Sequence, residues 1–389
     1  MIGLRVDHLL SPEQKRECSV PSSAPSPAAG GSRSAPRVLL VAAPLMARSG
    51  VYRSTHDLVA EARGRGLDWR AVVGLRPTAR GTVATTPGVR EVTVRAHGRA
   101  VVDEVAGLVT SAPEADAADV VVTLVTQSDV ALARLRRHGS TPWVAWVRGL
   151  PWPAPGEQAR LRRVALRLVE GRALRGADDV WATTPVLADE VARARRPHLV
   201  PAGIRLSARS SWGEAATPLV WAARFDVDKR PAAFVELAAR AGVPGRLHGQ
   251  GPLEDRLRAS LPDGVTMPGW VDPARLWDDA GLFVGTASRE AFGRSAVEAA
   301  AAGVPVLLGD SYGAAPLLVT DPDLRRRLVL PVGEPDRWLS AVRDLTADRA
   351  LRRTVSDHVA ANASLLSVGA SVDAVVDRLS RLGITAAAR

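Results

Sequence analysis

Residues 286–306 read TASREAFGRSAVEAAAAGVPV, and this stretch indicates the local fold more clearly than any other part of the chain. The alanine run favours a helix, and Gly303 followed by Pro305 is a C-terminal stop signal. We expect the helix to begin near Gly293 or Arg294. The first N–H groups of a helix are unpaired and its dipole is positive there, so this end favours an anion such as phosphate.

Two carboxylates flank the expected anion site. Glu290 lies on the loop before the helix, and Glu298 lies eight positions later, within the first turns. Carboxylates accept hydrogen bonds from hydroxyl groups, so the stretch predicts a site for a ligand that carries both a diphosphate and sugars. The simpler interpretation is an ordinary strand–helix unit with two solvated glutamates. The rest of the sequence decides between the two.

Lysine usage gives a second indication. The chain has only two lysines, Lys15 and Lys229, whereas arginine is abundant, so a lysine in a folded region marks a place that favours a compact ammonium. Arg224 and Lys229 follow the apolar run 219–223, expected to be a buried strand, and precede a helix expected to open near Pro231. Open α/β folds bind ligands at the carboxyl ends of their strands. The segment therefore predicts two cations facing an anionic ligand, although a solvated basic loop stays open for Arg224.

Length and charge limit the function classes. With 389 residues, two domains with ample core are expected, and the net charge of +10 favours acidic substrates such as nucleotide diphosphates, or an anionic membrane surface. The excess arginine is spread along the chain, and no RNA-recognition, zinc-finger or helix-turn-helix signature is visible. Nucleic acid is therefore not an expected partner.

The expected location is the cytoplasm. Cys18 is the only cysteine, which excludes an internal disulfide framework and suits a reducing compartment. No apolar run reaches about 18 residues, and the N-terminus lacks the apolar segment of a secretion signal. The basic amphipathic segment 159–175 is expected to pack on its own domain as a surface helix. A peripheral contact with the inner membrane face is the alternative.

Apolar runs alternate with helical patterns through both halves of the chain, which predicts two doubly wound α/β domains facing across a ligand-binding cleft. Residues 1–35 are rich in Pro, Ser, Ala and Gly and are expected to be disordered. The expected first domain is 36–206, the linker 207–217 and the second domain 218–370, while 371–389 forms a C-terminal helix that crosses back. The expected strands are residues 38–42, 68–73, 91–94, 120–124, 143–147, 180–183, 198–200, 219–223, 245–248, 265–267, 282–285, 304–308 and 327–330.

An ordered set of short motifs resembles the retaining glycosyltransferases of the large family 4, whose GT-B fold has two Rossmann-like domains. The resemblance covers roughly residues 36–365. Each motif is weak alone, but their order and spacing are specific. The motifs are Gly50 in the first loop, ADDVWATT at 177–184, VPAGI at 200–204, Arg224 with Lys229, HGQGP at 248–252, GWV at 269–271 and the pair Glu290 and Glu298.

The resemblance implies a metal-independent hexosyl- or related sugar transferase. Such an enzyme moves a sugar from a nucleoside-diphosphate sugar, its co-substrate, to a hydroxyl of a glycan, lipid or small natural product, and needs no cofactor. Arg224, Lys229 and Glu290 are the implied catalytic residues: the two cations neutralise the diphosphate, and Glu290 holds the sugar hydroxyls. Glu298 would accept hydrogen bonds from the ribose. The other implied donor-binding residues are Gly50, Gly249, Gly251, Trp270, Val271, Ala291, Phe292, Gly293 and Arg294.

One position departs from the family pattern. Members usually carry a histidine at the end of the strand that here spans 143–147, and Arg148 occupies that place. An arginine there could bind a carboxylate or phosphate on the donor sugar or on the acceptor, or it could be a structural residue at a domain edge. Both interpretations stay open. His56 and His248 have no carboxylate partner visible in sequence and stay unassigned.

Other functions remain as alternatives. A catalytically impaired nucleotide-sugar-binding subunit that regulates a partner is made conceivable by Arg148. An epimerase or phosphorylase-like enzyme would share the fold, but the pair Glu290 and Glu298 argues against it. A nucleic-acid-binding protein would be retained on DNA or RNA in a salt-sensitive way. The sequence names neither the base, the sugar nor the acceptor, and it does not indicate an oligomeric state.

Overall fold

The structure is a computed structural model that describes residues 35–48, 50–135, 141–153, 158–206, 217–269, 271–272 and 275–386. Residues 35–389 form one unit, within which two α/β lobes are distinguished below. The N-terminal extension expected at 1–35 lies outside the described residues except for Ala35, and so do the expected linker, except for Thr217, and Trp270.

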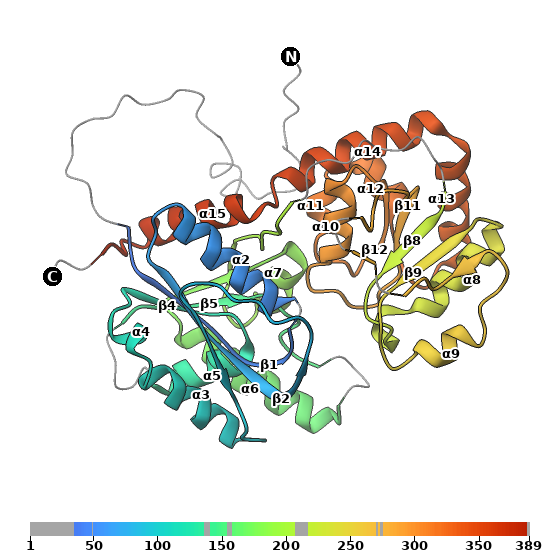
Figure 1. The fold of residues 1–389 in the computed structure, drawn as a ribbon. Coiled ribbons are helices and arrows are strands. Elements are labelled where there is room, and N and C mark those ends of the chain that lie inside the picture. The colour runs from blue at the N-terminus through green and yellow to red at the C-terminus, as the bar shows by residue number, and fades with distance from the viewer. Residues whose placement is uncertain are drawn as a thin grey trace, which may run out of the picture. The chain divides into compact units, whose positions relative to one another are not determined.

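The first lobe is built on a seven-stranded parallel sheet with the strand order β3-β2-β1-β4-β5-β6-β7 (Figure 1). Its central strands β1, β4 and β5 are nearly continuous apolar runs, as expected for a parallel sheet covered by helices on both faces. The strands are β1 Val38–Ala47, β2 Trp69–Arg80, β3 Val89–Thr93, β4 Val120–Thr123, β5 Trp143–Val147, β6 Asp179–Ala182 and β7 His198–Leu199. The helices are α2 Val51–Gly64, α3 Ala100–Thr110, α4 Pro113–Asp116, α5 Thr126–Leu135, α6 Arg160–Gly176 and α7 Pro185–Val191.

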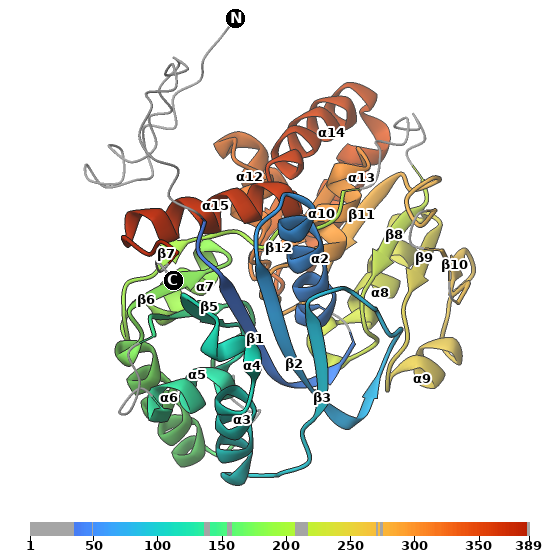
Figure 2. The same cartoon turned by 60° about the vertical axis from the view of Figure 1, so that its left-hand side comes forward.

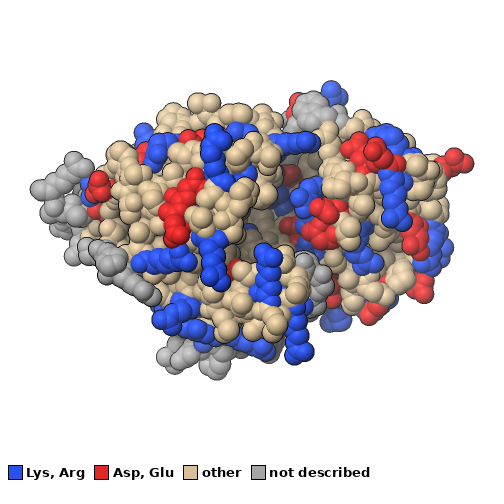
Figure 3. Space-filling model, turned by 90° about the horizontal axis from the view of Figure 1, so that it is seen from below, with Lys and Arg blue, Asp and Glu red and all other residues tan. Residues whose placement is uncertain are grey.

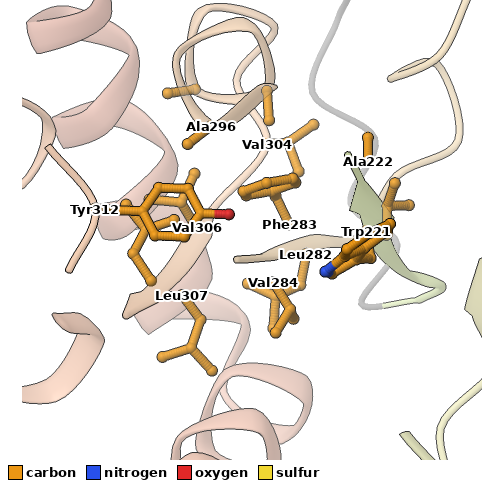
Figure 4. Close-up of a cluster of buried hydrophobic side chains, with 14 of the residues drawn as sticks. Trp221, Ala222, Leu282, Phe283, Val284, Ala296, Val304, Val306, Leu307 and Tyr312 are labelled. Carbon is orange, nitrogen blue, oxygen red and sulfur yellow. The ribbon is translucent and has the colours of Figure 1, made fainter. Parts of the chain in front are cut away.

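The second lobe repeats the design with a six-stranded parallel sheet, in the order β10-β9-β8-β11-β12-β13. Its strands are β8 Leu219–Ala222, β9 Gly245–His248, β10 Val265–Thr266, β11 Leu282–Gly285, β12 Val306–Gly309 and β13 Val329–Leu330. Its helical segments are the 3-10 turn η2 Val227–Lys229, α8 Pro231–Ala241, α9 Glu254–Arg258, α10 Arg294–Ala301, α11 Ala315–Leu318, α12 Pro322–Leu328, α13 Pro335–Ala347 and α14 Arg349–Ser364. The central strands pack Trp221, Phe283 and Val306 into one apolar cluster with Ala296 of α10 (Figure 4).

The two lobes confirm the predicted pair of doubly wound α/β domains, and the sequence-based strand assignments differ mainly at their ends. β1 and β2 run further than expected, because their pairing resumes after Pro44, with Leu45 opposite Leu75. β13 begins only at Val329, since α12 occupies the preceding residues. That helix starts efficiently because the Asp321 carboxylate caps its first turn, accepting hydrogen bonds from two backbone N–H groups.

The chain ends on the first lobe although the second lobe precedes it in sequence. Helix α15, Val368–Arg381, lies beside α2 (Figure 2), and Val372 and Leu379 belong to the apolar core of the first lobe. Arg378 forms an ion pair of 3.1 Å with Asp179 of β6. At the crossing point, Ile204 and Ser367 form a parallel bridge. The C-terminal helix is therefore part of the first lobe's core.

Candidate functional site

A cavity of about 240 Å³ lies between the lobes, and nine of the residues predicted for the site line it. The molecule is visibly hollowed there, with charged side chains around the hollow (Figure 3). The loops after β1, β5, β8 and β11 supply these residues, so the sheets present the ends at which open α/β folds bind ligands. The nine are Gly50, Arg148, Arg224, Lys229, Glu290, Ala291, Phe292, Gly293 and Arg294.

Lys229 and Glu290 form an ion pair in this cavity. Lys229 lies in the turn η2, and its Nζ is 2.9 Å from Oε2 of Glu290 and 3.2 Å from Oδ2 of Asp228. Nζ also donates a hydrogen bond of 3.1 Å to the carbonyl oxygen of Arg289. Burial acts to lower the pKa of Lys229, but the two carboxylates outweigh it and the pKa is raised. The ammonium is thus held charged and in place at the cavity wall.

Arg224, the second predicted cation, is arranged differently. Its side chain is 65% exposed and forms an ion pair of 2.7 Å with Asp226, two residues away. Asp226 in turn caps the turn η2, accepting a hydrogen bond from the N–H group of Val227. Arg224 therefore lines the cavity from its solvent side, where its guanidinium has room to move toward an anion.

The N-terminus of α10 faces the same cavity. Gly293 is its N-cap residue, with φ 93° and ψ 57°, a left-handed conformation that favours glycine. A Cβ atom at this position would lie 2.6 Å from the ring of Tyr312, so glycine is also required by space. Having no side chain, Gly293 offers no cap, and Arg294 and Ser295 of the first turn line the cavity. A helix end of this kind is suited to an anion.

Glu298, the second carboxylate of the motif, does not line this cavity. It lies one turn further along α10, where its Oε1 is 3.6 Å from the guanidinium of Arg294, and its side chain is 33% exposed. Burial raises the pKa of Glu298, and the nearby cations Arg294 and Arg53 oppose this rise. The Glu298 carboxylate can therefore accept hydrogen bonds only from ligand hydroxyls that lie beyond the first turn of α10.

The glycines of the HGQGP motif hold protein backbone rather than lining the cavity. A Cβ atom on Gly249 would lie 1.9 Å from the carbonyl oxygen of Ala223, and one on Gly251 would lie 2.4 Å from that of Phe225. The motif thus packs the loop after β9 against the loop that carries Arg224. Val271 also lies outside the lining of this cavity.

Arg148 closes the cavity on the side of the first lobe. It is only 6% exposed, and its guanidinium stacks 4.5 Å above the ring of Trp146. Burial, together with repulsion from Arg294, lowers the pKa of Arg148 to about 9, against a smaller attraction from Asp57. Nη1 is buried without any hydrogen-bond partner. Trp143 and Trp146 are buried in the sheet, in strand β5.

A second, larger cavity of about 940 Å³ lies in the first lobe and shares Arg148 with the first cavity. Two carboxylates that the sequence analysis missed line it, Asp129 of α5 and Glu170 of α6. Burial raises the pKa of Asp129 to about 7 against a hydrogen bond of 2.5 Å from the Thr123 hydroxyl. Burial and the proximity of Asp129 raise the pKa of Glu170 to about 8. The only sequence signal was Glu170 itself, the single acidic residue in a helix rich in arginine.

The structure supplies a partner for one histidine. Nε2 of His56 is 3.7 Å from the carboxylate of Glu91 on β3, and its Nδ1 is 3.0 Å from the hydroxyl of Thr86. His56, which the sequence left unassigned, therefore lies near a carboxylate in the folded chain, because β3 approaches α2 there. Burial lowers the pKa of both His56 and His248. Neither side chain lines the cavity between the lobes, so neither gains a catalytic role from its position.

Tyr312 is a further lining residue that the sequence analysis missed. It is buried, and burial raises its pKa. It follows β12 in the segment GDSYG, and its backbone bridges to that of Glu290. The turn is tight, since a Cβ atom on Gly313 would lie 1.9 Å from the carbonyl oxygen of Ala291. The segment that carries Tyr312 thereby holds the loop between β11 and α10 in place.

Neither a metal-binding group of side chains nor a membrane-spanning helix is found among the described residues. No group of three or more His, Cys, Asp or Glu side chains in that part of the chain is arranged to hold a metal ion. No helix in the same ranges is long and apolar enough to cross a membrane.

Comparisons with known proteins place this geometry in context. Residues 222–360 match the model of the family described as glycosyl transferases group 1. No curated protein sequence matches the chain. Among solved structures, the chain is similar to sucrose-phosphate synthase from Thermosynechococcus elongatus, with 19% identity, a TM-score of 0.70 and coverage of 89% of this chain and 99% of that one.

Two further solved structures share the fold. The chain is similar to HepE from Anabaena in complex with UDP-glucose, with 20% identity, a TM-score of 0.69 and coverage of 88% and 99%. It is also similar to WaaG, a glycosyltransferase involved in lipopolysaccharide biosynthesis, with 14% identity, a TM-score of 0.65 and coverage of 88% and 99%. These similarities show the GT-B fold predicted from the sequence.

Proposed function

We propose that the chain, whose residues 222–360 match the model of the glycosyl transferases group 1, transfers a sugar from a nucleoside-diphosphate sugar to a hydroxyl of an acceptor. The observation that carries the proposal is the ion pair of Lys229 and Glu290 beside the uncapped N-terminus of α10. Both lie in the cavity between the lobes. This places a fixed positive charge, N–H donors and a carboxylate within one site, which suits a diphosphate joined to a polyhydroxylated sugar.

The proposed chemistry retains the configuration at the anomeric carbon. The bond from the anomeric carbon to the diphosphate oxygen breaks, and a bond to the acceptor oxygen forms on the same face of the sugar. The acceptor proton passes to the departing diphosphate, so no protein base is needed. Lys229 and the N-terminus of α10 stabilise the charge that develops on the leaving group, and Arg224 joins them from the solvent side. Because these groups supply the positive charge, we propose that the reaction is metal-independent.

Glu290 and Glu298 have separate roles in this proposal. Glu290 is oriented by Lys229 and accepts hydrogen bonds from hydroxyls of the donor sugar. Glu298 lies one turn further along α10, and in this proposal it accepts hydrogen bonds from the ribose hydroxyls. The acceptor enters the first lobe, where the cavity of about 940 Å³ adjoins the donor side at Arg148.

A binding screen identifies the donor, and a variant of Glu298 then tests the proposed site. UDP, GDP, ADP, dTDP and their sugars are tested for a rise in the melting temperature, because a ligand that binds the native state stabilises it. UDP-glucose is tested first, since the similar structure of HepE contains it. In Glu298→Gln, kcat/KM for the donor that binds should fall at least about tenfold, which is about 1.4 kcal/mol. The absence of binding by every nucleotide would contradict the proposal.

A regulatory subunit without catalytic activity is the second candidate. The observation behind it is Arg148, which replaces the histidine usual in the family at the wall of the site. Such a subunit would bind the nucleotide sugar but neither transfer nor hydrolyse it. Release of nucleoside diphosphate by the purified protein, measured with a coupled assay, excludes this candidate.

We also propose a peripheral contact with an anionic membrane surface through α6, with the enzyme in the cytoplasm. Part of this helix is apolar and exposed, including Leu161, Val164 and Leu168, and Leu161 is 86% exposed. The exposed apolar side chains lie among six arginines of the same helix. Sedimentation with vesicles of phosphatidylglycerol, compared with phosphatidylcholine, measures this contact. Equal recovery with both vesicle types, or Leu161→Ser with unchanged recovery, contradicts it.

A further inference from the structure

The Arg148 guanidinium is buried, and no described residue forms an ion pair with it or accepts a hydrogen bond from its Nη1. A guanidinium carries five N–H donors and keeps its charge in proteins. Burying such a group unpaired is costly, so an unpaired arginine calls for an explanation.

A second buried arginine shows what a structural role looks like in this chain. Arg352 of α14 is 5% exposed, almost the same as Arg148 at 6%. Its Nη1 donates hydrogen bonds of 2.8 Å and 2.9 Å to the carbonyl oxygens of Leu345 and Thr346, and so it ties α14 to the end of α13. Arg148 makes no comparable bond within the described residues. The interpretation of Arg148 as a structural residue at a domain edge is therefore unsupported.

The surroundings of Arg148 orient its guanidinium without neutralising it. Trp146 provides the flat surface on which the guanidinium stacks, and its ring packs nearly perpendicular to that of Trp181, with ring centroids 5.7 Å apart. The nearby charges are Arg294, which repels, and Asp57, which attracts more weakly. An oriented guanidinium with an excess of positive charge around it is suited to a planar oxyanion.

Arg148 also lies where the two cavities meet. It lines both the cavity that contains Lys229 and Glu290 and the larger cavity of the first lobe. A group bound to it is therefore close to the donor sugar on one side and to the acceptor on the other. In the proposed function, the diphosphate is bound by Lys229 and the N-terminus of α10.

We propose that Arg148 binds a carboxylate or phosphate group carried by one of the two substrates, either the donor sugar or the acceptor. This inference rests on the proposed sugar transfer. It requires that either the donor sugar or the acceptor carries an anionic group in addition to the donor's diphosphate. The group binds at the junction of the two cavities. Arg148 is then a specificity residue that selects the anionic substrate over its neutral counterpart.

The test measures dissociation constants by calorimetry in two arms. The donor arm compares UDP-glucuronate with UDP-glucose, or the same sugars on whichever nucleotide stabilises the protein. The acceptor arm compares a panel of free hexoses with their monophosphates, with and without the nucleoside diphosphate. The expected result is at least about tenfold tighter binding of the anionic member in one arm, which is about 1.4 kcal/mol. The arm that shows the preference identifies the substrate that carries the group.

Three variants connect that preference to Arg148. Arg148→Met should abolish it while leaving the affinity for the nucleoside diphosphate unchanged, and Arg148→Lys should reduce it because an ammonium lacks the planar fork. The matched control is Arg167→Met, since Arg167 also stacks on a tryptophan, 5.0 Å above Trp152, but is exposed. This control should keep the full preference.

Several outcomes overturn the proposal. The proposal is wrong if the wild type binds the anionic and neutral ligands equally in both arms. It is also wrong if the preference for the anionic ligand persists in Arg148→Met. A matching loss of affinity for the nucleoside diphosphate in that variant would make Arg148 a diphosphate ligand instead. If Arg148→Met does not fold, a preference undiminished in Arg148→Lys counts against the proposal. Failure of the proposed function is seen separately, as the absence of nucleotide binding by the wild type.

Discussion

The two lobes share one sheet design but differ in whether their buried ionisable side chains are paired. Their central strands follow the same order, with the first strand of each lobe between the second and the fourth. In the second lobe, Lys229 is already paired with Glu290. In the first lobe, Arg148, Asp129 and Glu170 line cavities, and none of the three has an ion pair among the described residues.

This difference indicates which half of the site is preorganised. A charge that is paired before the ligand arrives keeps its position and needs little rearrangement, which is how an enzyme stabilises a leaving group. Unpaired buried ionisable side chains instead gain their partners from the ligand. They therefore favour a ligand that supplies such partners. The nucleotide-binding half of the site should therefore bind several kinds of donor. The first lobe should determine which substrate is accepted.

The largest effect is expected from Lys229→Ala, which removes the preorganised charge. The variant leaves Glu290 and Asp228 without their shared cation, 2.9 Å and 3.2 Å from the missing Nζ. We expect kcat to fall about a hundredfold or more, as when a single stabilising donor is removed from an oxyanion site. Steady-state kinetics with the donor found by the binding screen measure this change.

Two controls sharpen the prediction for Lys229. Lys229→Arg keeps the charge but replaces a compact ammonium with a planar group, so it should recover only part of the activity. Arg224→Ala should cost less than Lys229→Ala, because Arg224 is exposed and, among the described residues, pairs only with Asp226. If Arg224→Ala proved the more damaging variant, the preorganised charge would not be the one that matters.

The next effect is expected in stability, from two glycines, one in each lobe. Gly249→Ala places a Cβ atom 1.9 Å from the carbonyl oxygen of Ala223, so the backbone has to move. We expect a loss of about 3 kcal/mol or more in the free energy of unfolding. Gly50→Ala meets no protein atom within 4 Å and is strained only by its φ of 47°, so about 1–2 kcal/mol is expected.

The ligand should distinguish the same two glycines. Gly50 lines the cavity between the lobes, whereas Gly249 does not. Gly50→Ala should therefore weaken donor binding more than its small loss of stability explains. Urea unfolding and calorimetric titration of each variant measure the two quantities. Equal losses of stability in both variants would contradict the contact with the Ala223 carbonyl oxygen.

The fold was predictable because its signals are local. Runs such as Val120–Thr123 and Leu282–Gly285 are continuous and apolar, so each predicts a buried parallel strand wherever it lies in the chain. Gly293 was identified for the same reason, since it lies between a loop carboxylate and an alanine-rich helix. Nine of the predicted site residues line one cavity because the loops that follow parallel strands gather at one edge of each sheet.

What the sequence did not reveal depends on pairs of residues distant in the chain. Asp129 and Glu170 lie 41 positions apart and meet only because α5 packs on α6. Glu91 reaches His56 because β3 joins the edge of the sheet beside β2. The sequence also could not decide whether Arg148 is structural, since that depends on the absence of acceptors around a buried guanidinium. Such contacts follow from packing, which no local pattern encodes.

The smallest effect is expected in the pH dependence of stability, and it belongs to the first lobe. The pKa of Asp129 is raised to about 7 and that of Glu170 to about 8, while carboxyls in an unfolded chain titrate near pH 4. Between these values the folded state holds protons that the unfolded chain has released. Their stabilising contribution is therefore complete below about pH 4 and is lost as the pH rises through about 7 and 8.

Replacing both carboxyls with amides should remove this loss. The melting temperature of Asp129→Asn/Glu170→Gln should exceed that of the wild type by at least a few degrees at pH 8.5 and differ little from it at pH 4. The difference between the two proteins isolates this effect, since buried histidines such as His56 titrate in both. Glu236→Gln, which changes an exposed carboxylate of α8, should behave as the wild type. Equal dependence on pH in the double variant and the wild type would show that the first lobe already neutralises these carboxylates, and the contrast between the lobes would then rest on Arg148 alone.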